Sequence, residues 1–160
     1  MTNTLSVGLG ELVISKNPED ILVAYGLGSC VGVGMICPTS KVGGLLHAVL
    51  PENTDGDKTS TKFVDTGIPV MLEKMKQAGA DMRKIKVYMA GGANMLINTT
   101  LSKTFDIGTR NAAAAKAMFD KLNIQVMNSE VGGNTGRTVR LYVAQGKMTV
   151  RMIGGTERDL

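Results

Sequence analysis

Residues 31–50 read VGVGMIC-PTSK-VGGLLHAVL, and this stretch decides the fold. Two apolar, glycine-punctuated runs flank the turn-forming group Pro38-Thr39-Ser40, a pattern that predicts a β-hairpin. If the runs pair about this turn, the numbers of opposed residues add up to roughly 77 to 79. Cys30 then faces residues 47 to 49, and this range includes His47, the only histidine of the chain. Directly opposed side chains share one face of a sheet, so we expect Cys30 and His47 to lie together.

Strand and helix patterns continue on both sides of this hairpin. Apolar residues at helical spacing predict helices over residues 64–78 and about 110–122, ended by Gly79 and Asn123. The chain shows no linker, repeat or change of composition, which indicates one domain over residues 1–160. We expect an α/β fold: a layered sandwich of mixed, largely hairpin-built β-sheet flanked by two helices. Short apolar runs bounded by turn residues predict six further strands, at residues 11–15, 21–25, 84–90, 124–131, 138–144 and 147–153.

Composition and charge narrow the class of protein. Hydrophobic residues make up 43% and charged residues 20% of the 160, which is typical of a globular domain with a core. The net charge of +4 comes from scattered basic residues, and aromatic residues are 4% with no Trp, which argues against a nucleic-acid binder. We find no signal peptide and no apolar run long enough to insert into a membrane. Two cysteines are too few for a disulfide framework, so we expect a cytoplasmic protein with reduced thiols.

The glycine-rich segment Gly26-Leu-Gly-Ser-Cys30 admits two interpretations. A nucleotide-binding glycine loop needs a helix directly after the glycines, whereas a strand pattern follows here. The alternative is a turn that presents a nucleophile, with Cys30 exposed by the bend. Backbone N–H groups around Gly28 and Ser29 would then stabilise a developing oxyanion. We favour the nucleophile turn.

A Cys30–His47 pair has the groups needed for nucleophilic catalysis, because the imidazole can take the thiol proton and later protonate a leaving amine. For an arbitrary cysteine the ordinary interpretation is a small buried hydrophobe. That interpretation fits Cys37, which lies seven positions from Cys30 and should point to the opposite face of the strand. A zinc site from Cys30, His47 and Asp55 or Asp57 lacks the spacing of structural zinc ligands, and we expect no metal.

Two further motifs are less specific. Gly91-Gly92 is typical of a turn at the end of a strand, and it is also a candidate for the wall of a cleft or a partner surface. Arg110 and Asn111 stand where the second helix is expected to begin. They fit two interpretations equally well: a simple helix start, or residues that line a cleft or a partner surface.

Several irregular motifs in a fixed order give the chain a resemblance to the CheD family over nearly its whole length. The resemblance implies that Cys30 is the nucleophile and His47 its base. The third catalytic member of the family, usually a threonine, corresponds to Ala24, so we expect the main-chain carbonyl of Ala24 to hold the imidazole. The motifs are GLGSC at 26–30, GGLLHAVLP at 43–51, KFVDTGI at 62–68, AGGANM at 90–95, IGTRN at 107–111 and GGNTGR at 132–137.

What the resemblance implies is a glutamine deamidase acting on methyl-accepting chemotaxis receptors. Specific glutamine side chains would be hydrolysed to glutamate through a thioester on Cys30, which tunes chemotaxis signalling and adaptation without a metal or organic cofactor. The resemblance also implies a CheC phosphatase as partner, and a fold similar to the cysteine hydrolases of the cytotoxic necrotizing factor type. Two rivals stay open: a mainly non-catalytic adaptor that binds receptors and CheC, and a cysteine hydrolase of another amide.

Overall fold

The hairpin predicted from residues 31–50 is the centre of the structure. A computed structural model of the chain describes residues 2–94 and 106–160. In it, β4 (Val31–Cys37) pairs antiparallel with β5 (Val42–Ala48) in an unbroken register from Val31↔Ala48 to Cys37↔Val42. Opposed residue numbers add up to 79, at the upper end of the predicted range, and His47 lies opposite Gly32.

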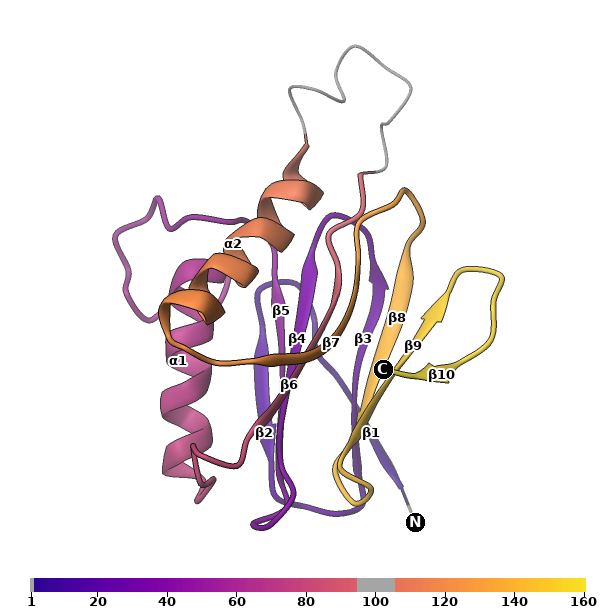
Figure 1. Ribbon diagram of the computed structural model, residues 1–160. Coiled ribbons are helices and arrows are strands. Elements are labelled where there is room, and N and C mark those ends of the chain that lie inside the picture. The colour runs from indigo at the N-terminus through magenta and orange to yellow at the C-terminus, as the bar shows by residue number, and fades with distance from the viewer. Residues whose placement is uncertain (1, 95–105) are drawn as a thin grey trace.

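Within the described residues the chain forms ten strands and two helices (Figure 1). The central sheet has the order β2-β5-β4-β6-β7, and the outer sheet has the order β1-β3-β8-β9-β10. Both are mixed, because β6 pairs parallel with β7 and β1 pairs parallel with β3 while the other pairs are antiparallel. The remaining elements are β1 (Asn3–Ser6), β2 (Leu12–Ser15), β3 (Asp20–Leu27), α1 (Val64–Gln77), β6 (Lys86–Gly91), α2 (Ile107–Lys121), β7 (Val126–Val131), β8 (Arg137–Tyr142), β9 (Lys147–Met152) and β10 (Arg158–Asp159).

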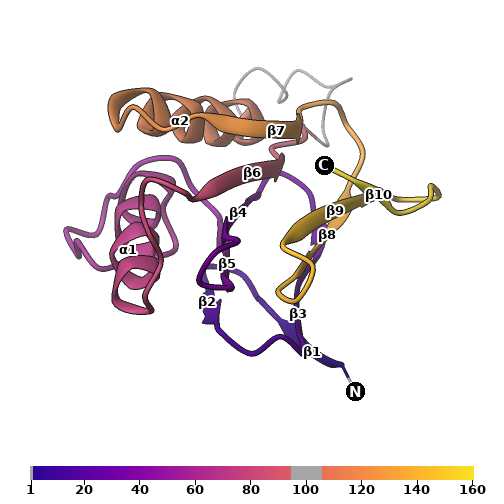
Figure 2. The ribbon, with the colours of Figure 1, turned by 60° about the horizontal axis from the view of Figure 1, so that its bottom comes forward.

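The elements stack in three layers, with the central sheet in the middle. One of its faces packs on the outer sheet, and both helices cover the other face (Figure 2). The alternation of side chains along β4 separates two apolar clusters accordingly. Val33 and Met35 belong to the cluster under the helices, whereas Ile36 belongs to the cluster between the sheets. The layered α/β domain predicted from the sequence is confirmed.

Glycines on the inner face of the hairpin bring the two sheets close together. A Cβ atom added at Gly43 would lie 2.7 Å from Leu141 Cδ2, and one added at Gly32 would lie 3.0 Å from Leu27 Cδ1. Both distances are shorter than ordinary van der Waals contacts, so side chains of the outer sheet occupy the space that larger residues would need. The inner face of β4 and β5 is therefore covered tightly by β3 and β8.

The eight predicted strands and both helices are present, with small changes at their ends. The second helix begins at Ile107, three residues earlier than expected. Gly79 and Asn123 both adopt positive φ angles directly after the helices, which agrees with their predicted role as stops. Two strands were missed: β1, whose four residues are all exposed, and the two-residue β10. No helix in the described ranges is long and apolar enough to cross a membrane.

We predict that Met71→Ala lowers the free energy of unfolding by about 2–5 kcal/mol. Met71 is fully buried in α1 and belongs to the apolar cluster between the helices and the central sheet. The substitution removes apolar contacts and leaves a cavity. Urea denaturation followed by circular dichroism measures the change.

The matched control is Lys76→Ala, at an exposed position of the same helix. We expect it to change the free energy of unfolding by less than about 0.5 kcal/mol. Equal effects of the two substitutions would contradict the packing of α1 on β5.

Candidate active site

Cys30 lies at the end of a short turn between β3 and β4. The turn follows Gly26, whose φ of 62° is a conformation that glycine adopts without strain. A strand and not a helix follows the turn, so the helix N-terminus that a nucleotide-binding loop requires is absent from this part of the described chain. The Cys30 side chain is 9% exposed and joins the apolar cluster between the two sheets.

Three successive carbonyls of this turn are held by segments far away in the chain. The Gly28 carbonyl accepts a hydrogen bond from the N–H of Ala93 at 2.9 Å, and the Cys30 carbonyl accepts one from the N–H of Gly92 at 2.8 Å. The Ser29 carbonyl accepts one from the side-chain amide of Asn111, also at 2.8 Å. The turn is therefore fixed from the side of β6 and α2.

Gly91 and Gly92 are buried behind the turn, so they do not form the cleft wall or partner surface that we considered for them. Gly91 has a φ of 108°, and a Cβ atom added there would overlap the Cys30 carbonyl. Gly92 donates to that same carbonyl. Their physical role is to let β6 end directly against the backbone of Cys30, an approach that a side chain would block.

His47 is buried in β5, and its imidazole is held by a main-chain carbonyl. Nδ1 lies 2.9 Å from the carbonyl oxygen of Val7. Because a carbonyl only accepts, this contact requires the hydrogen on Nδ1, which leaves Nε2 with the free lone pair in the neutral ring. Nε2 is buried and has no hydrogen-bond partner among the described residues.

The carbonyl that holds His47 belongs to Val7, so our assignment of this role to Ala24 is wrong. Ala24 is buried in β3 opposite Val139, within the outer sheet. The chain leaves the outer sheet after β1 and crosses to β5, where Gly10 donates to the carbonyl of His47. This crossing brings the Val7 carbonyl to the imidazole, whereas the backbone of Ala24 stays in the β3–β8 pairing.

The strand register places Cys30 and His47 on the same face of the central sheet. His47 opposes Gly32, and Cys30 precedes Gly32 by two residues, so the side chains of Cys30 and His47 project to the same side. Cys37 belongs to the cluster on the opposite face, as predicted, and both cysteines are free. Both side chains thus project from the face of the central sheet that is turned toward the outer sheet.

Burial acts differently on the two thiols. It raises the pKa of Cys30, and the thiol's contact with its own backbone N–H offsets this in part. At Cys37 burial also raises the pKa, but hydrogen bonds with Ser40 and Thr39 outweigh it and lower the pKa to about 7. Cys37 is 0% exposed, however, so its thiolate is shielded from reagents in the folded protein.

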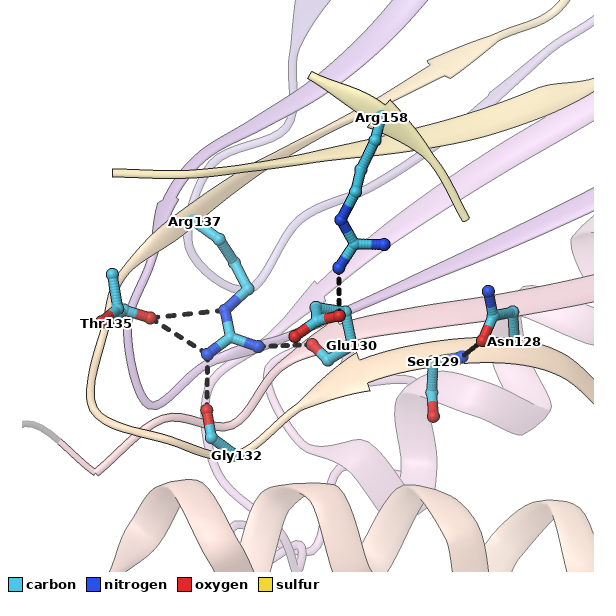
Figure 3. Close-up of polar contacts among 7 residues, drawn as sticks. All are labelled: Asn128, Ser129, Glu130, Gly132, Thr135, Arg137 and Arg158. Carbon is cyan, nitrogen blue, oxygen red and sulfur yellow. Dashed lines mark hydrogen bonds and ion pairs between the residues drawn. The ribbon is translucent and has the colours of Figure 1, made fainter. Parts of the chain in front are cut away.

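The buried guanidinium of Arg137 holds the loop that contacts Gly91. It donates to the main-chain carbonyls of Glu130, Gly132 and Thr135, and Glu130 also forms an ion pair with Arg158 (Figure 3). The loop held in this way contacts β6 in turn, because the N–H of Gly132 donates to the Gly91 carbonyl at 3.0 Å. Burial lowers the pKa of Arg137, an effect that Glu130 opposes.

Sequence reasoning assigned no role to Arg137 beyond its place in the motif GGNTGR. A signal was available in the alternation of β8, where Arg137, Val139 and Leu141 occupy the inward positions. An arginine at such a position must find acceptors for its donors, because unpaired buried donors are costly.

Arg110 and Asn111 have different surroundings although they are adjacent. Arg110 is exposed, lies 3.2 Å from Asp106 in an ion pair and lines a pocket of about 500 Å³. Asn111 is completely buried and donates to the carbonyls of Ser29 and Val49, so it lies behind the turn and not on a surface. The pocket is lined by Leu50, Pro51, Glu52, Thr54, Ile107, Arg110, Ala113 and Ala114.

Within residues 2–94 and 106–160, no three His, Cys, Asp or Glu side chains come together in a way that could hold a metal ion. The last residue of the motif AGGANM, Met95, lies outside the described residues.

A buried cysteine and a histidine with a free ring nitrogen, on a layered α/β domain, define a candidate site of the cysteine-hydrolase class. Comparison with known proteins identifies the family. The family model described as "CheD chemotactic sensory transduction" matches residues 49–152. The chain belongs to the CheD family.

Three relatives named as probable chemoreceptor glutamine deamidases CheD are similar over most of their length. The protein of Clostridium tetani is 40% identical over 150 residues, covering 92% of this chain and 90% of the relative. That of Syntrophus aciditrophicus, called CheD 1, is 41% identical and covers 96% and 97%. That of Desulforamulus reducens is 38% identical and covers 94% and 91%. Positions 30 and 47 precede the region of the family model, but each of these longer matches covers at least 92% of the 160 residues and so spans both positions.

We predict that iodoacetamide labels Cys30 in the folded protein at a rate that climbs about tenfold per pH unit, up to a pH above the ordinary thiol value of 9.0. The reason is that only the thiolate reacts and burial keeps its fraction small. Peptide mass spectrometry measures the rate. A labelling rate that no longer rises with pH at pH 7 would mean that Cys30 is already a thiolate there.

Cys37 supplies the internal comparison for this experiment. Its pKa is the lower of the two, but it has no exposed surface, so we expect labelling only after unfolding in urea. Labelling of Cys37 ahead of Cys30 in the folded protein would mean that this face of the sheet opens readily.

We also predict that Arg137→Met lowers the free energy of unfolding by at least about 2 kcal/mol, because buried carbonyls that it now satisfies lose their donor. The control is Arg140→Met on the same strand, where the arginine forms a 4.0 Å ion pair with Glu157. We expect less than about 1 kcal/mol there. Urea denaturation of both variants tests the difference, and equal losses would argue against the bracing role of Arg137.

Proposed function

We propose that this protein is a protein-glutamine glutaminase that hydrolyses glutamine side chains of methyl-accepting chemotaxis receptors to glutamate, with Cys30 as nucleophile and His47 as base. The observation that carries the proposal is the buried Nε2 of His47, which has no partner among the described residues and stands on the face of the sheet that bears Cys30. The names of the relatives supply the substrate class.

The first step is attack on the glutamine carboxamide. Because burial raises the pKa of Cys30, the thiol is protonated at rest, and His47 Nε2 takes its proton as the sulfur–carbon bond forms. The carbonyl oxygen of the substrate becomes an oxyanion. Val7 accepts the hydrogen bond from Nδ1 throughout, so the imidazolium formed in this step keeps a partner for its second N–H.

The second step releases ammonia and leaves a thioester on Cys30. The protonated His47 gives its proton to the departing nitrogen, and the carbon–nitrogen bond breaks. Water then attacks the thioester, with His47 again removing a proton, and hydrolysis yields glutamate and the free thiol. Every proton in this sequence is taken up or given back by His47, and no metal or organic cofactor takes part.

The backbone of the turn supports the oxyanion. Each of the three carbonyls from Gly28 to Cys30 has a donor behind the turn. The N–H of Cys30 lies on the side of its own sulfur, where it offsets part of the rise in the thiol pKa. We assign to this N–H, together with that of Ser29, the stabilisation of the oxyanion.

The wider setting of the proposal follows from family membership. The helical cytoplasmic region of the receptors is the proposed place of action, and a CheC phosphatase is the proposed partner. In such a region, each new glutamate adds a negative charge and so changes the repulsion between neighbouring helices.

Cys30→Ala should abolish deamidation while the protein stays folded, because the substitution removes the nucleophile and little core volume. The measurement is mass spectrometry of a receptor cytoplasmic fragment, which gains about 1 Da for each glutamine converted to glutamate. The matched control is Cys37→Ala, which removes a buried thiol from the opposite face of the central sheet and should retain most of the activity.

Deamidation near the wild-type rate by Cys30→Ala would refute the nucleophile assignment. A wild-type protein that binds the fragment without converting any glutamine would refute the enzymatic proposal and favour the adaptor. Loss of activity in Cys37→Ala with an intact fold would mean that the reactive thiol is on the other face of the sheet.

A further inference from the structure

We infer that Asn111 is a positioning residue for the oxyanion site: its side-chain amide holds the Ser29–Cys30 peptide group so that the Cys30 N–H faces the reacting thiol. This inference rests on the proposed function. Asn111 is the fifth residue of α2, more than 80 positions away from the Gly28–Cys30 turn in the sequence, and it is completely buried.

The side-chain amide of Asn111 has two N–H groups, and each has its own acceptor. Nδ2 lies 2.8 Å from the Ser29 carbonyl oxygen and 2.8 Å from the Val49 carbonyl oxygen. The chemistry of the acceptors fixes which way the amide faces, because the opposite orientation would direct Oδ1 at two other oxygens. Ser29 directly precedes Cys30, and Val49 follows His47 by two residues. One side chain thus joins the turn of the thiol to the strand of the imidazole.

Holding the Ser29 carbonyl also determines the direction of the next N–H. A peptide group is planar, and in the trans form its C=O and N–H point in opposite directions. The described residues contain no cis peptide bond. With the Ser29 carbonyl directed at α2, the Cys30 N–H must face away from α2. A rotation of this one peptide group would exchange the two and direct a carbonyl oxygen at the developing oxyanion.

Among the three carbonyls of the turn, that of Ser29 is the one whose donor is a side chain. Gly28 and Cys30 are held by the backbone N–H groups of Ala93 and Gly92, which exist whatever the residue. The orientation of the Ser29–Cys30 peptide group therefore depends on the identity of residue 111, and substitution can test it.

An unpaired atom supports this assignment. Asn111 Oδ1 is buried and has no hydrogen-bond partner among the described residues, which is unfavourable for a polar atom. A leucine of similar size would fill the same space without that unpaired oxygen. The two donors of the amide give a physical reason for an asparagine at this position.

The test compares two reactions of Cys30 that differ in their need for an oxyanion site. Acylation by p-nitrophenyl acetate passes through a tetrahedral oxyanion: the sulfur–carbon bond forms, p-nitrophenolate leaves and a thioester remains. Alkylation by iodoacetamide displaces iodide at a saturated carbon and forms no oxyanion. Both require the Cys30 thiolate, so the ratio of their rates reports on the oxyanion site and cancels changes in thiol pKa or access.

The variants are Asn111→Leu and Asn111→Asp, with Thr109→Val as control on the same turn of α2. Thr109 hydrogen-bonds to Asn94, and in the described part of the chain it forms no hydrogen bond with the Ser29 carbonyl. Leucine removes both donors. Ionised aspartate keeps the shape while offering the carbonyls no donor, so the second variant decides if the first does not fold. The acylation and alkylation rates that remain in Cys30→Ala come from other groups of the protein, and they are subtracted.

We expect the acylation-to-alkylation ratio to fall by about 10²-fold in both Asn111 variants, the loss that removal of one oxyanion donor causes, and to stay within about threefold of wild type in Thr109→Val. Receptor deamidation should fall with the ratio. An unchanged ratio would overturn the inference, including the case in which acylation and alkylation fall equally because the whole site is lost. The ratio could fall in the Asn111 variants although the wild-type protein deamidates no receptor fragment. That result would support the positioning role of Asn111 and refute the proposed function.

Discussion

The narrow space between the two sheets is the constraint on which the rest of the structure depends. It exists because glycines occupy the inner face of the β4–β5 hairpin, so that residues such as Leu141 of the outer sheet pack almost against the backbone. The layer formed in this way is apolar, and Cys30 and His47 lie at one end of it. Desolvation there disfavours a thiolate at rest, which is why the proposed mechanism moves the proton during attack.

Main-chain groups make most of the hydrogen bonds that orient the candidate site. The imidazole is held by the Val7 carbonyl, and two of the three carbonyls in the turn are held by the backbone of Gly92 and Ala93. Substitution does not remove such groups, provided the local path of the chain is kept. Alanine at position 24, whose side chain offers no hydrogen-bond acceptor, is compatible with an ordered imidazole for this reason.

The parts that sequence reasoning could predict are those set by local pattern. The hairpin register followed from a period of two and one turn, and it placed Cys30 on the same face of the sheet as His47. The Val7 carbonyl had no sequence signal, because every residue carries a carbonyl and only the crossing after β1 selects this one. Asn111 and Arg137 were missed as structural supports because polar residues are expected at the surface, and their acceptors come from distant segments. The edge strand β1 is exposed throughout and lacks the apolar alternation that identifies strands.

The order in which these segments occur along the chain has a consequence for synthesis. Cys30 and His47 sit in the first third of the polypeptide, whereas the groups that fix the turn come from Gly92, Ala93 and Asn111. A ribosome therefore completes the hairpin well before it has made α2, and until then nothing holds the Ser29 carbonyl. Since domains generally fold as units, a competent catalytic turn arises only with the folded whole. The nascent chain carries Cys30 before the groups that orient its turn have been made, so the proposed hydrolysis can begin only when folding is complete.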